Sequence, residues 1–202
     1  MNPVQAVVFD IGNVLLGWQP EQFFDRVIGP ERRAALFAEV DLHGMNLAVD
    51  RGASLRESIA AMRAAHPGWA SEIQIWQDRW SEMLSPVLTE SVALMRTLRS
   101  AGLPVYALSN FGAETFEIAR AEHAFLDEFD LRFISGQLGV MKPEPEIYAI
   151  VEAATSFPPD ALFFTDDNAA NIAQAARRGW QTHLFTGAAG LRDALNLHGI
   201  KV

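Results

Sequence analysis

The stretch VVFDIGNVLLGW, residues 7–18, decides the fold, because a run of apolar β-formers ends on a carboxylate, Asp10. Short apolar runs with few charges predict five buried strands, at residues 4–10, 103–109, 131–135, 161–165 and 181–185. Amphipathic helical patterns lie between them, as in TESVALMRTLRSAG and DDNAANIAQAARRG, where a glycine suits each helix end. Strands that alternate with helices predict an α/β fold with a doubly wound parallel sheet.

Residues 18–88 interrupt this alternation, and only helices are expected there. Helical patterns cover residues 20–28, 31–40, 54–65 and 71–84, with breaks at glycines and prolines between them. We therefore predict a core domain made of residues 1–17 and 89–202, with residues 18–88 inserted as an α-helical cap over the strand ends.

Composition excludes several kinds of protein. Half of the 202 residues are hydrophobic, which predicts a packed globule, and there is no cysteine for disulfides, thiolate metal sites or a cysteine nucleophile. The net charge of −9, without a cluster of Lys and Arg, argues against nucleic acid as a partner. No apolar run is long enough to cross a membrane and no signal peptide is evident, so a cytoplasmic location is expected. Protein partners are not indicated.

Polar residues stand at four places where strands or their loops end, namely Asp10, Ser109–Asn110, Lys142 and Asp166–Asp167. Lys142 lies in GVMKPEPEIY, before a helix whose start we expect at Pro143. The carboxyl ends of parallel strands meet at one edge of a sheet, where ligands bind. Each place alone has an ordinary structural use, as a turn, a helix cap or a solvated lysine. Their convergence favours a functional site.

The carboxylates at this edge would repel one another strongly without a cation. Oxygen ligands without cysteine or histidine favour Mg²⁺, which keeps positions for water and a substrate phosphate. Lys142 adds a positive charge for an anion, and Ser109 adds a hydroxyl. One carboxylate is then free to attack phosphorus and to form an acyl-phosphate.

The segments FDIGNV, LSN, KPEPEIY and FFTDDNAAN, in this order, resemble the four motifs of the haloacid dehalogenase (HAD) superfamily. The resemblance covers the whole chain and is closest to the small sugar-phosphate phosphatases with an FD-x-GN first motif and a helical cap. It implies an enzyme, a Mg²⁺-dependent phosphomonoester hydrolase. The implied substrate is a small phosphorylated metabolite, with a sugar phosphate as the leading expectation.

The resemblance also implies a role for each residue. Asp10 is the nucleophile, and Ser109 and Lys142 hold the transferring phosphoryl group. The other expected residues surround the metal or the phosphate: Asp167 as a direct Mg²⁺ ligand with Asp10, Gly12 through its carbonyl, Asp166 through water, and Asn110 and Asn171 beside them.

Gly12 departs from the family pattern, because most phosphatases of the superfamily have an aspartate there as general acid for the leaving group. Its absence costs about 10²–10⁴-fold in rate unless something replaces it. A cap residue or water replaces it, or the leaving group needs no acid, or the protein is a 2-haloacid dehalogenase or an inactive metabolite-binding relative. The paired acids Asp166 and Asp167 argue against the dehalogenase, which needs no metal.

The cap offers several candidates for contact with the substrate. His43, in DLHGMN, is the first candidate for a replacement proton donor because the pKa of histidine is near neutral. Larger cap residues either line a substrate pocket or only pack the cap, and helical spacing favours packing: Trp18, Phe23, Phe24, Asn46, Trp76 and Trp80.

Overall fold

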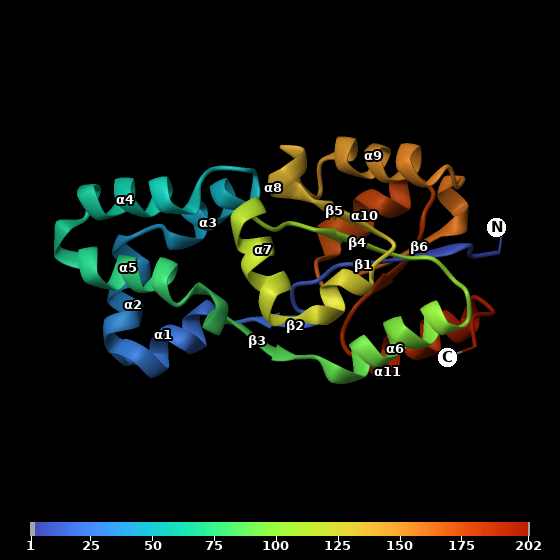
Figure 1. The fold of residues 1–202 in the computed structure, drawn as a ribbon, viewed down its shortest axis with the longest axis horizontal. Coiled ribbons are helices and arrows are strands. Elements are labelled where there is room, and N and C mark those ends of the chain that lie inside the picture. Colours follow the sequence, from blue (N-terminus) through green and yellow to red (C-terminus); the bar gives the residue numbers. More distant parts are fainter. Residues whose placement is uncertain (1–2, 202) are drawn as a thin grey trace.

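The computed structural model describes residues 3–201 and contains a five-stranded sheet of order β5-β4-β1-β6-β7 (Figure 1). Every neighbouring pair in this sheet is parallel. The strands are β1 (Ala6–Phe9), β4 (Val105–Ser109), β5 (Leu131–Ile134), β6 (Leu162–Asp166) and β7 (Gln181–Leu184). The predicted doubly wound α/β fold is confirmed, and all five predicted strands are present.

Helices cover both faces of the sheet, because successive side chains of a strand point to opposite faces. Val7 and Phe9 belong to one apolar cluster, whereas Ala6 and Val8 belong to another. The helices of this part of the chain are α6 (Thr89–Ser100), α7 (Ala113–Glu122), α8 (Ser135–Leu138), α9 (Pro145–Thr155), α10 (Ala169–Arg177) and α11 (Ala188–Leu197), with 3₁₀ turns η3 (Ala124–Glu128) and η4 (Pro159–Ala161).

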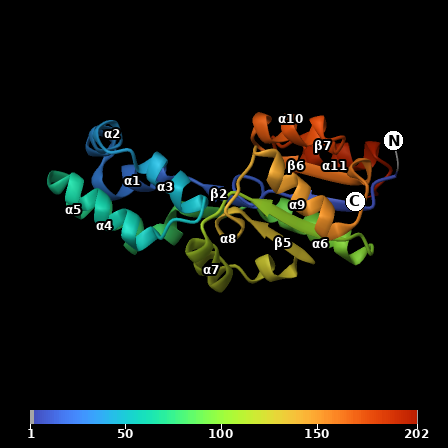
Figure 2. The same cartoon turned by 90° about the horizontal axis from the view of Figure 1, so that it is seen from above.

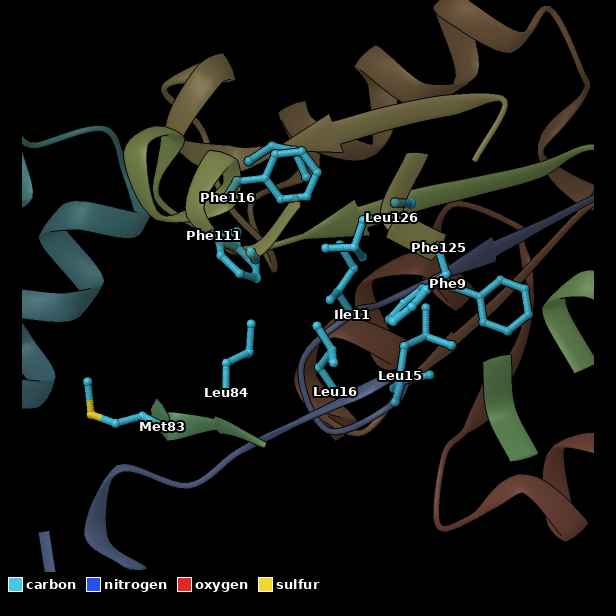
Figure 3. Packing of buried hydrophobic residues seen from close by; sticks show 14 of the residues in the cluster. Phe9, Ile11, Leu15, Leu16, Met83, Leu84, Phe111, Phe116, Phe125 and Leu126 are labelled. Atoms are coloured by element: carbon cyan, nitrogen blue, oxygen red, sulfur yellow. The ribbon is translucent and has the colours of Figure 1, made fainter. Parts of the chain in front are cut away.

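The larger apolar cluster continues from the sheet into the turn after β1. Ile11, Leu15 and Leu16 are fully buried and pack together there, close to Phe9 (Figure 3). The backbone N–H groups of Leu15 and Leu16 both donate to the carbonyl of Ile11. This tight turn fixes the loop that carries Asp10 and Gly12 at the end of the central strand.

The inserted segment begins and ends with strands, which corrects the expectation of helices alone over residues 18–88. β2 (Leu16–Trp18) pairs antiparallel with β3 (Leu84–Val87). Strands this short carry too few residues for a periodic signal, and β3 contains a proline. The two strands approach closely at Gly17, where a Cβ would lie 2.6 Å from the carbonyl oxygen of Ser85.

Between these strands the chain forms helices that lie beyond the carboxyl ends of the parallel strands (Figures 1 and 2). They are α1 (Pro20–Ile28), α2 (Pro30–Glu39), α3 (Leu42–Asp50), α4 (Leu55–Ala65) and α5 (Ala70–Asp78), with 3₁₀ turns η1 (Pro67–Trp69) and η2 (Trp80–Met83). Helix α3 was not predicted from the sequence. Its N-cap is Asp41, whose side chain accepts the Gly44 N–H at 2.8 Å. Within residues 3–201, no helix combines the length and apolar character needed to span a membrane.

Candidate active site

Three neighbouring strands bring their carboxyl ends to one point at the middle of the sheet edge. Asp10 follows β1, while Ser109 and Asp166 are the last residues of β4 and β6. A cavity of about 250 Å³ opens there between the sheet edge and the inserted segment. Its lining from the sheet side is Asp10, Gly12, Asn13, Ser109, Asn110, Phe111, Lys142, Asp167, Asn168 and Asn171.

The carboxylate of Asp10 is held in one orientation. Its Oδ1 accepts hydrogen bonds from the Ile11 N–H and the Ser109 hydroxyl, both at 2.7 Å. Its Oδ2 lies 2.9 Å from Nζ of Lys142. Burial raises the pKa of Asp10 to about 7; Lys142 and the Ser109 hydrogen bond lower it, whereas the charge of Asp166 raises it. A divalent cation nearby would favour the ionised form.

Lys142 is 2% exposed, and its ammonium bridges two carboxylates. Nζ lies 2.9 Å from Oδ2 of Asp10 and 2.6 Å from Oδ2 of Asp166. Burial lowers the pKa of Lys142, but the two carboxylates outweigh this effect and keep the pKa above its ordinary value. The ammonium is therefore charged and lies directly against the carboxylate of Asp10.

The backbone around Lys142 is fixed by Asn110. The Asn110 amide donates to the Lys142 carbonyl at 2.9 Å and accepts the Lys142 N–H at 2.8 Å. The helix that follows starts at Pro145, with Glu144 as its N-cap, so the expected start at Pro143 is wrong by two residues. Pro143 instead follows a cis peptide bond.

Asp166 is completely buried, and several protein groups bind its carboxylate. Oδ1 accepts the Asn168 N–H at 2.7 Å, and both oxygens lie within 3.1 Å of the Asn171 amide. Together with the contact to Lys142, these bonds occupy both oxygens. In this arrangement Asp166 positions Lys142.

A metal ion fits beside these residues. Ligand oxygens of Asp10, Asp166 and Asp167 all lie within 4.8 Å of one another. Three carboxylates face a single ammonium, so two negative charges remain for a divalent cation to balance when all three are ionised. Carboxylate oxygens suit Mg²⁺, and Asp167 is exposed enough to reach it.

Asn13 is a site residue that sequence reasoning missed. Its Nδ2 donates to Oδ2 of Asp167 at 3.0 Å, and its Oδ1 accepts the Trp18 N–H at 2.9 Å. Asn13 has a positive φ of 53°, a conformation that asparagine tolerates better than most residues. The asparagine of FDIGNV, directly after a glycine, was the available signal.

The inserted segment contributes Trp18, Asn46, Asp50, Trp80 and Leu84 to the cavity. Phe23, Phe24 and Trp76 are buried within the segment, so the large residues divide between the cavity and packing. His43 is not among the described residues that line the cavity. Its side chain is 52% exposed and its Nε2 lies 2.9 Å from Oε1 of Glu21, so the structure does not bring His43 to Asp10.

The chain is therefore a doubly wound α/β protein with an acidic site at the carboxyl ends of its strands, where a lysine bridges two carboxylates. The model of the haloacid dehalogenase-like hydrolase family matches residues 4–179, and the chain belongs to this family.

Curated relatives match at the sequence level, among them two Aspergillus proteins. Drimenol cyclase drtB of Aspergillus calidoustus is 24% identical over 189 residues, which are 90% of this chain and 34% of the cyclase. The chain thus spans about a third of the length of that relative. Sesquiterpene phosphatase astK of Aspergillus oryzae is 24% identical over 196 residues, with 87% of this chain and 86% of the phosphatase covered.

Solved structures share the fold. The HAD family enzyme bt-2542 of Bacteroides thetaiotaomicron, in complex with magnesium and inorganic phosphate, has a TM-score of 0.72 at 23% identity, covering 91% of this chain and 95% of that one. L-2-haloacid dehalogenase of Xanthobacter autotrophicus has a TM-score of 0.62 at 20% identity, with 89% and 76% covered.

Proposed function

We propose that this protein is a Mg²⁺-dependent phosphomonoester hydrolase that acts on a small phosphorylated metabolite through an aspartyl-phosphate intermediate. The observation that carries the proposal is the fixed carboxylate of Asp10. Ser109 and the Ile11 N–H hold one of its oxygens and Lys142 contacts the other, at a cavity that Asp167 also lines. The sesquiterpene phosphatase relative and the magnesium and phosphate of bt-2542 support the same reaction class.

The reaction follows from the positions of these groups. A carboxylate oxygen of Asp10 attacks phosphorus, and the bond to the leaving oxygen breaks on the opposite side. The Lys142 ammonium and the Ser109 hydroxyl stabilise negative charge on the phosphoryl oxygens. Water then hydrolyses the acyl-phosphate and restores Asp10. Asp10, Asp167 and the Gly12 carbonyl would hold Mg²⁺, which supplies further charge neutralisation at the phosphoryl group.

We assign residues 18–88 as a cap and residues 1–17 and 89–202 as the core. The helices of the segment lie beyond the strand ends, and five of its residues share the cavity with the core residues. A cap over this edge keeps bulk water away from the reacting groups and encloses the organic part of the substrate.

The lining of the cavity supports a sugar phosphate as the substrate. The ring centroids of Trp18 and Trp80 lie 5.7 Å apart with the ring planes tilted by 35°, and the ring centroid of Phe111 lies 5.6 Å from that of Trp80. Aromatic faces suit the apolar face of a sugar ring, while Asn46 and Asp50 offer polar groups to hydroxyls.

The same aromatic wall, together with Leu84, favours a second substrate of the same reaction class. A terpenyl phosphate would place its hydrocarbon chain against Trp18, Trp80, Leu84 and Phe111. The relative named a sesquiterpene phosphatase supports this alternative. A sugar would give Asn46 and Asp50 hydrogen-bond partners through its hydroxyls, whereas a terpenyl chain would not.

The test is the release of inorganic phosphate from a panel of sugar phosphates, other metabolite phosphates and a sesquiterpene alcohol phosphate. Each is assayed with Mg²⁺ and with EDTA, and Asp10→Asn serves as the blank. We expect release that needs Mg²⁺ and is lost in Asp10→Asn. Metal-independent halide release from a 2-haloacid would replace the proposal with dehalogenation, and ligand binding without any turnover would replace it with a binding role.

A further inference from the structure

Asp50 is a carboxyl group of the cap that lines the cavity and that the reaction described above does not use. We propose that Asp50 is the general acid that protonates the leaving-group oxygen, in place of the acid that Gly12 cannot supply. This assignment rests on the proposed function and adds a catalytic residue to it.

A comparison of the titratable residues that line the cavity identifies Asp50 as the candidate acid. These residues are Asp10, Asp50, Lys142 and Asp167. Asp10 is the nucleophile, Lys142 is bridged between two carboxylates, and Asp167 faces the metal position. Asp50 remains as the carboxyl group that takes no part in the nucleophilic attack, in the contacts of Lys142 or in the metal site. It also stands on the cap, the side of the cavity where the organic leaving group must lie.

The side chain of Asp50 is held against the loop that follows β4. The backbone N–H of Gly112 donates to its carboxyl group, and the Asn46 amide donates to Oδ2 at 2.9 Å. Gly112 comes three residues after Ser109, the residue whose hydroxyl contacts the nucleophile. The carboxyl group of Asp50 is therefore hydrogen-bonded to the loop that directly follows Ser109.

The main chain of Asp50 is tied to the core as well. The Ser135 hydroxyl donates to the Asp50 carbonyl, and the same hydroxyl oxygen accepts the Phe111 N–H at 2.9 Å. Close packing adds to this clamp, because a Cβ at Gly112 would lie only 2.6 Å from Cγ1 of Val49. The end of α3 thus has a fixed position at the wall of the cavity, as a proton donor requires.

The electrostatic surroundings favour a proton on Asp50 near neutral pH. Burial raises the pKa of Asp50 to about 7, while the Gly112 N–H lowers it slightly. No cationic side chain within residues 3–201 forms an ion pair with it; the adjacent Arg51 pairs with Glu144 instead. The other charged groups that line the cavity are Asp10, Lys142 and Asp167. A carboxylate at a helix C-terminus also meets the negative end of the helix dipole.

The bond between an Asp10 oxygen and phosphorus forms while the bond from phosphorus to the leaving oxygen breaks. The electron pair of the broken bond stays on the leaving oxygen, which takes the proton of the Asp50 carboxyl group, so a neutral alcohol departs. The Asp50 carboxylate then accepts a proton from the water that attacks the aspartyl-phosphate, which returns Asp50 to its starting state.

The experiment compares two phosphate esters with wild type, Asp50→Asn and the control Asp78→Asn, which changes an exposed cap carboxylate. One ester has an alkyl leaving group, which needs a proton to depart, and the other an acidic phenol, which leaves as the anion. For Asp50→Asn we expect kcat to fall by about 10²–10⁴-fold on the alkyl ester and by less than about tenfold on the aryl ester. Asp78→Asn should match wild type on both.

The aryl ester also reports whether Asp50→Asn is folded. Equal losses on both esters would mean a structural or binding role and would overturn the assignment, as would full activity on the alkyl ester. A wild-type protein that releases phosphate from neither ester nor the substrate panel would overturn the proposed function itself. The two failures are therefore distinguishable.

Discussion

Nζ of Lys142 lies 2.6 Å from Oδ2 of Asp166, and neither side chain is exposed by more than 1%. A buried charge needs a partner, and here the ammonium has two, because Asp10 lies on its other side. Asp166 ends β6, next to the central strand β1, so the sheet itself sets the spacing of the two carboxylates.

Replacing Lys142 should destabilise the protein by about 3–5 kcal/mol, since Asp10 and Asp166 would remain buried without their cation. The variant is Lys142→Met, and the measurement is urea-induced unfolding without metal. Added Mg²⁺ should recover part of the loss by balancing the carboxylates. The other lysine of the chain, Lys201, is exposed, so Lys201→Met is the matched control and should leave stability unchanged. A small effect of Lys142→Met would contradict the buried ion-pair network.

Asp167→Asn should weaken the response to Mg²⁺ while leaving the fold intact, because this exposed carboxylate is the proposed metal ligand least involved in buried contacts. We expect the Mg²⁺ concentration for half-maximal activity to rise by about 100-fold or more. Replacing a residue that only hydrogen-bonds to a metal ligand typically costs about 10–100-fold in metal affinity, so a larger effect is expected for a ligand itself. The measurement is phosphate release across a Mg²⁺ titration. A normal titration curve would exclude Asp167 as a ligand.

Asp50→Asn should stabilise the protein above neutral pH, although it impairs catalysis. The native state keeps the Asp50 proton up to a pH of about 7, whereas the unfolded chain loses it near the ordinary pKa of 3.8. The native state thus binds more protons in this window, and stability falls as pH rises through it. Removing the charge should gain up to about 4 kcal/mol at pH 8, at about 1.4 kcal/mol per pKa unit.

Urea unfolding of Asp50→Asn, wild type and Asp78→Asn at pH 4 and pH 8 measures this effect. The difference between Asp50→Asn and wild type should appear at pH 8 and nearly vanish at pH 4. A difference of the same size at both pH values would show that it does not come from the charge of Asp50.

Gly112→Ala should loosen the contact between the cap and the core. Its Cβ would lie 2.6 Å from Cγ1 of Val49 and 2.8 Å from Oγ1 of Thr115, closer than such atoms pack. We expect a loss of about 1–3 kcal/mol in stability and a lower kcat, since α3 carries Asp50. Gly68→Ala is the matched control, because a Cβ there meets nothing within 4 Å. Equal behaviour of the two variants would contradict the tight docking of α3.

A carboxyl group placed at residue 12 should restore activity to Asp50→Asn on alkyl phosphates. A Cβ at Gly12 meets nothing within 4 Å, and Gly12 lines the cavity. Gly12→Asp therefore offers a new proton donor near the nucleophile without displacing neighbours. We expect the activity of the double variant to be at least about tenfold higher than that of Asp50→Asn, because general acid catalysis contributes about 10²–10⁴-fold. Absence of recovery, with the Mg²⁺ titration unchanged, would contradict this prediction.

The core of the fold was readable from the sequence because each parallel strand is buried on both faces. Such strands appear as short continuous apolar runs, and all five were predicted within a few residues. Glycines marked helix ends reliably, as at Gly102 and Gly179, both of which have positive φ. The inserted segment was harder to predict from the sequence, because the short strands β2 and β3 and the helix α3 lack a strong local pattern.

The α/β class, the polar strand ends and the gathering at one edge of Asp10, Ser109, Lys142 and Asp166–Asp167 could be predicted from the sequence, because the topology of a parallel sheet brings strand ends together wherever they lie in the chain. Which residues of the inserted segment face that edge depends on tertiary contacts. Asp50 lines the cavity and His43 does not, because the docking of α3 on Gly112 and Ser135 depends on contacts between residues far apart in the chain. No local pattern in the sequence encodes such contacts.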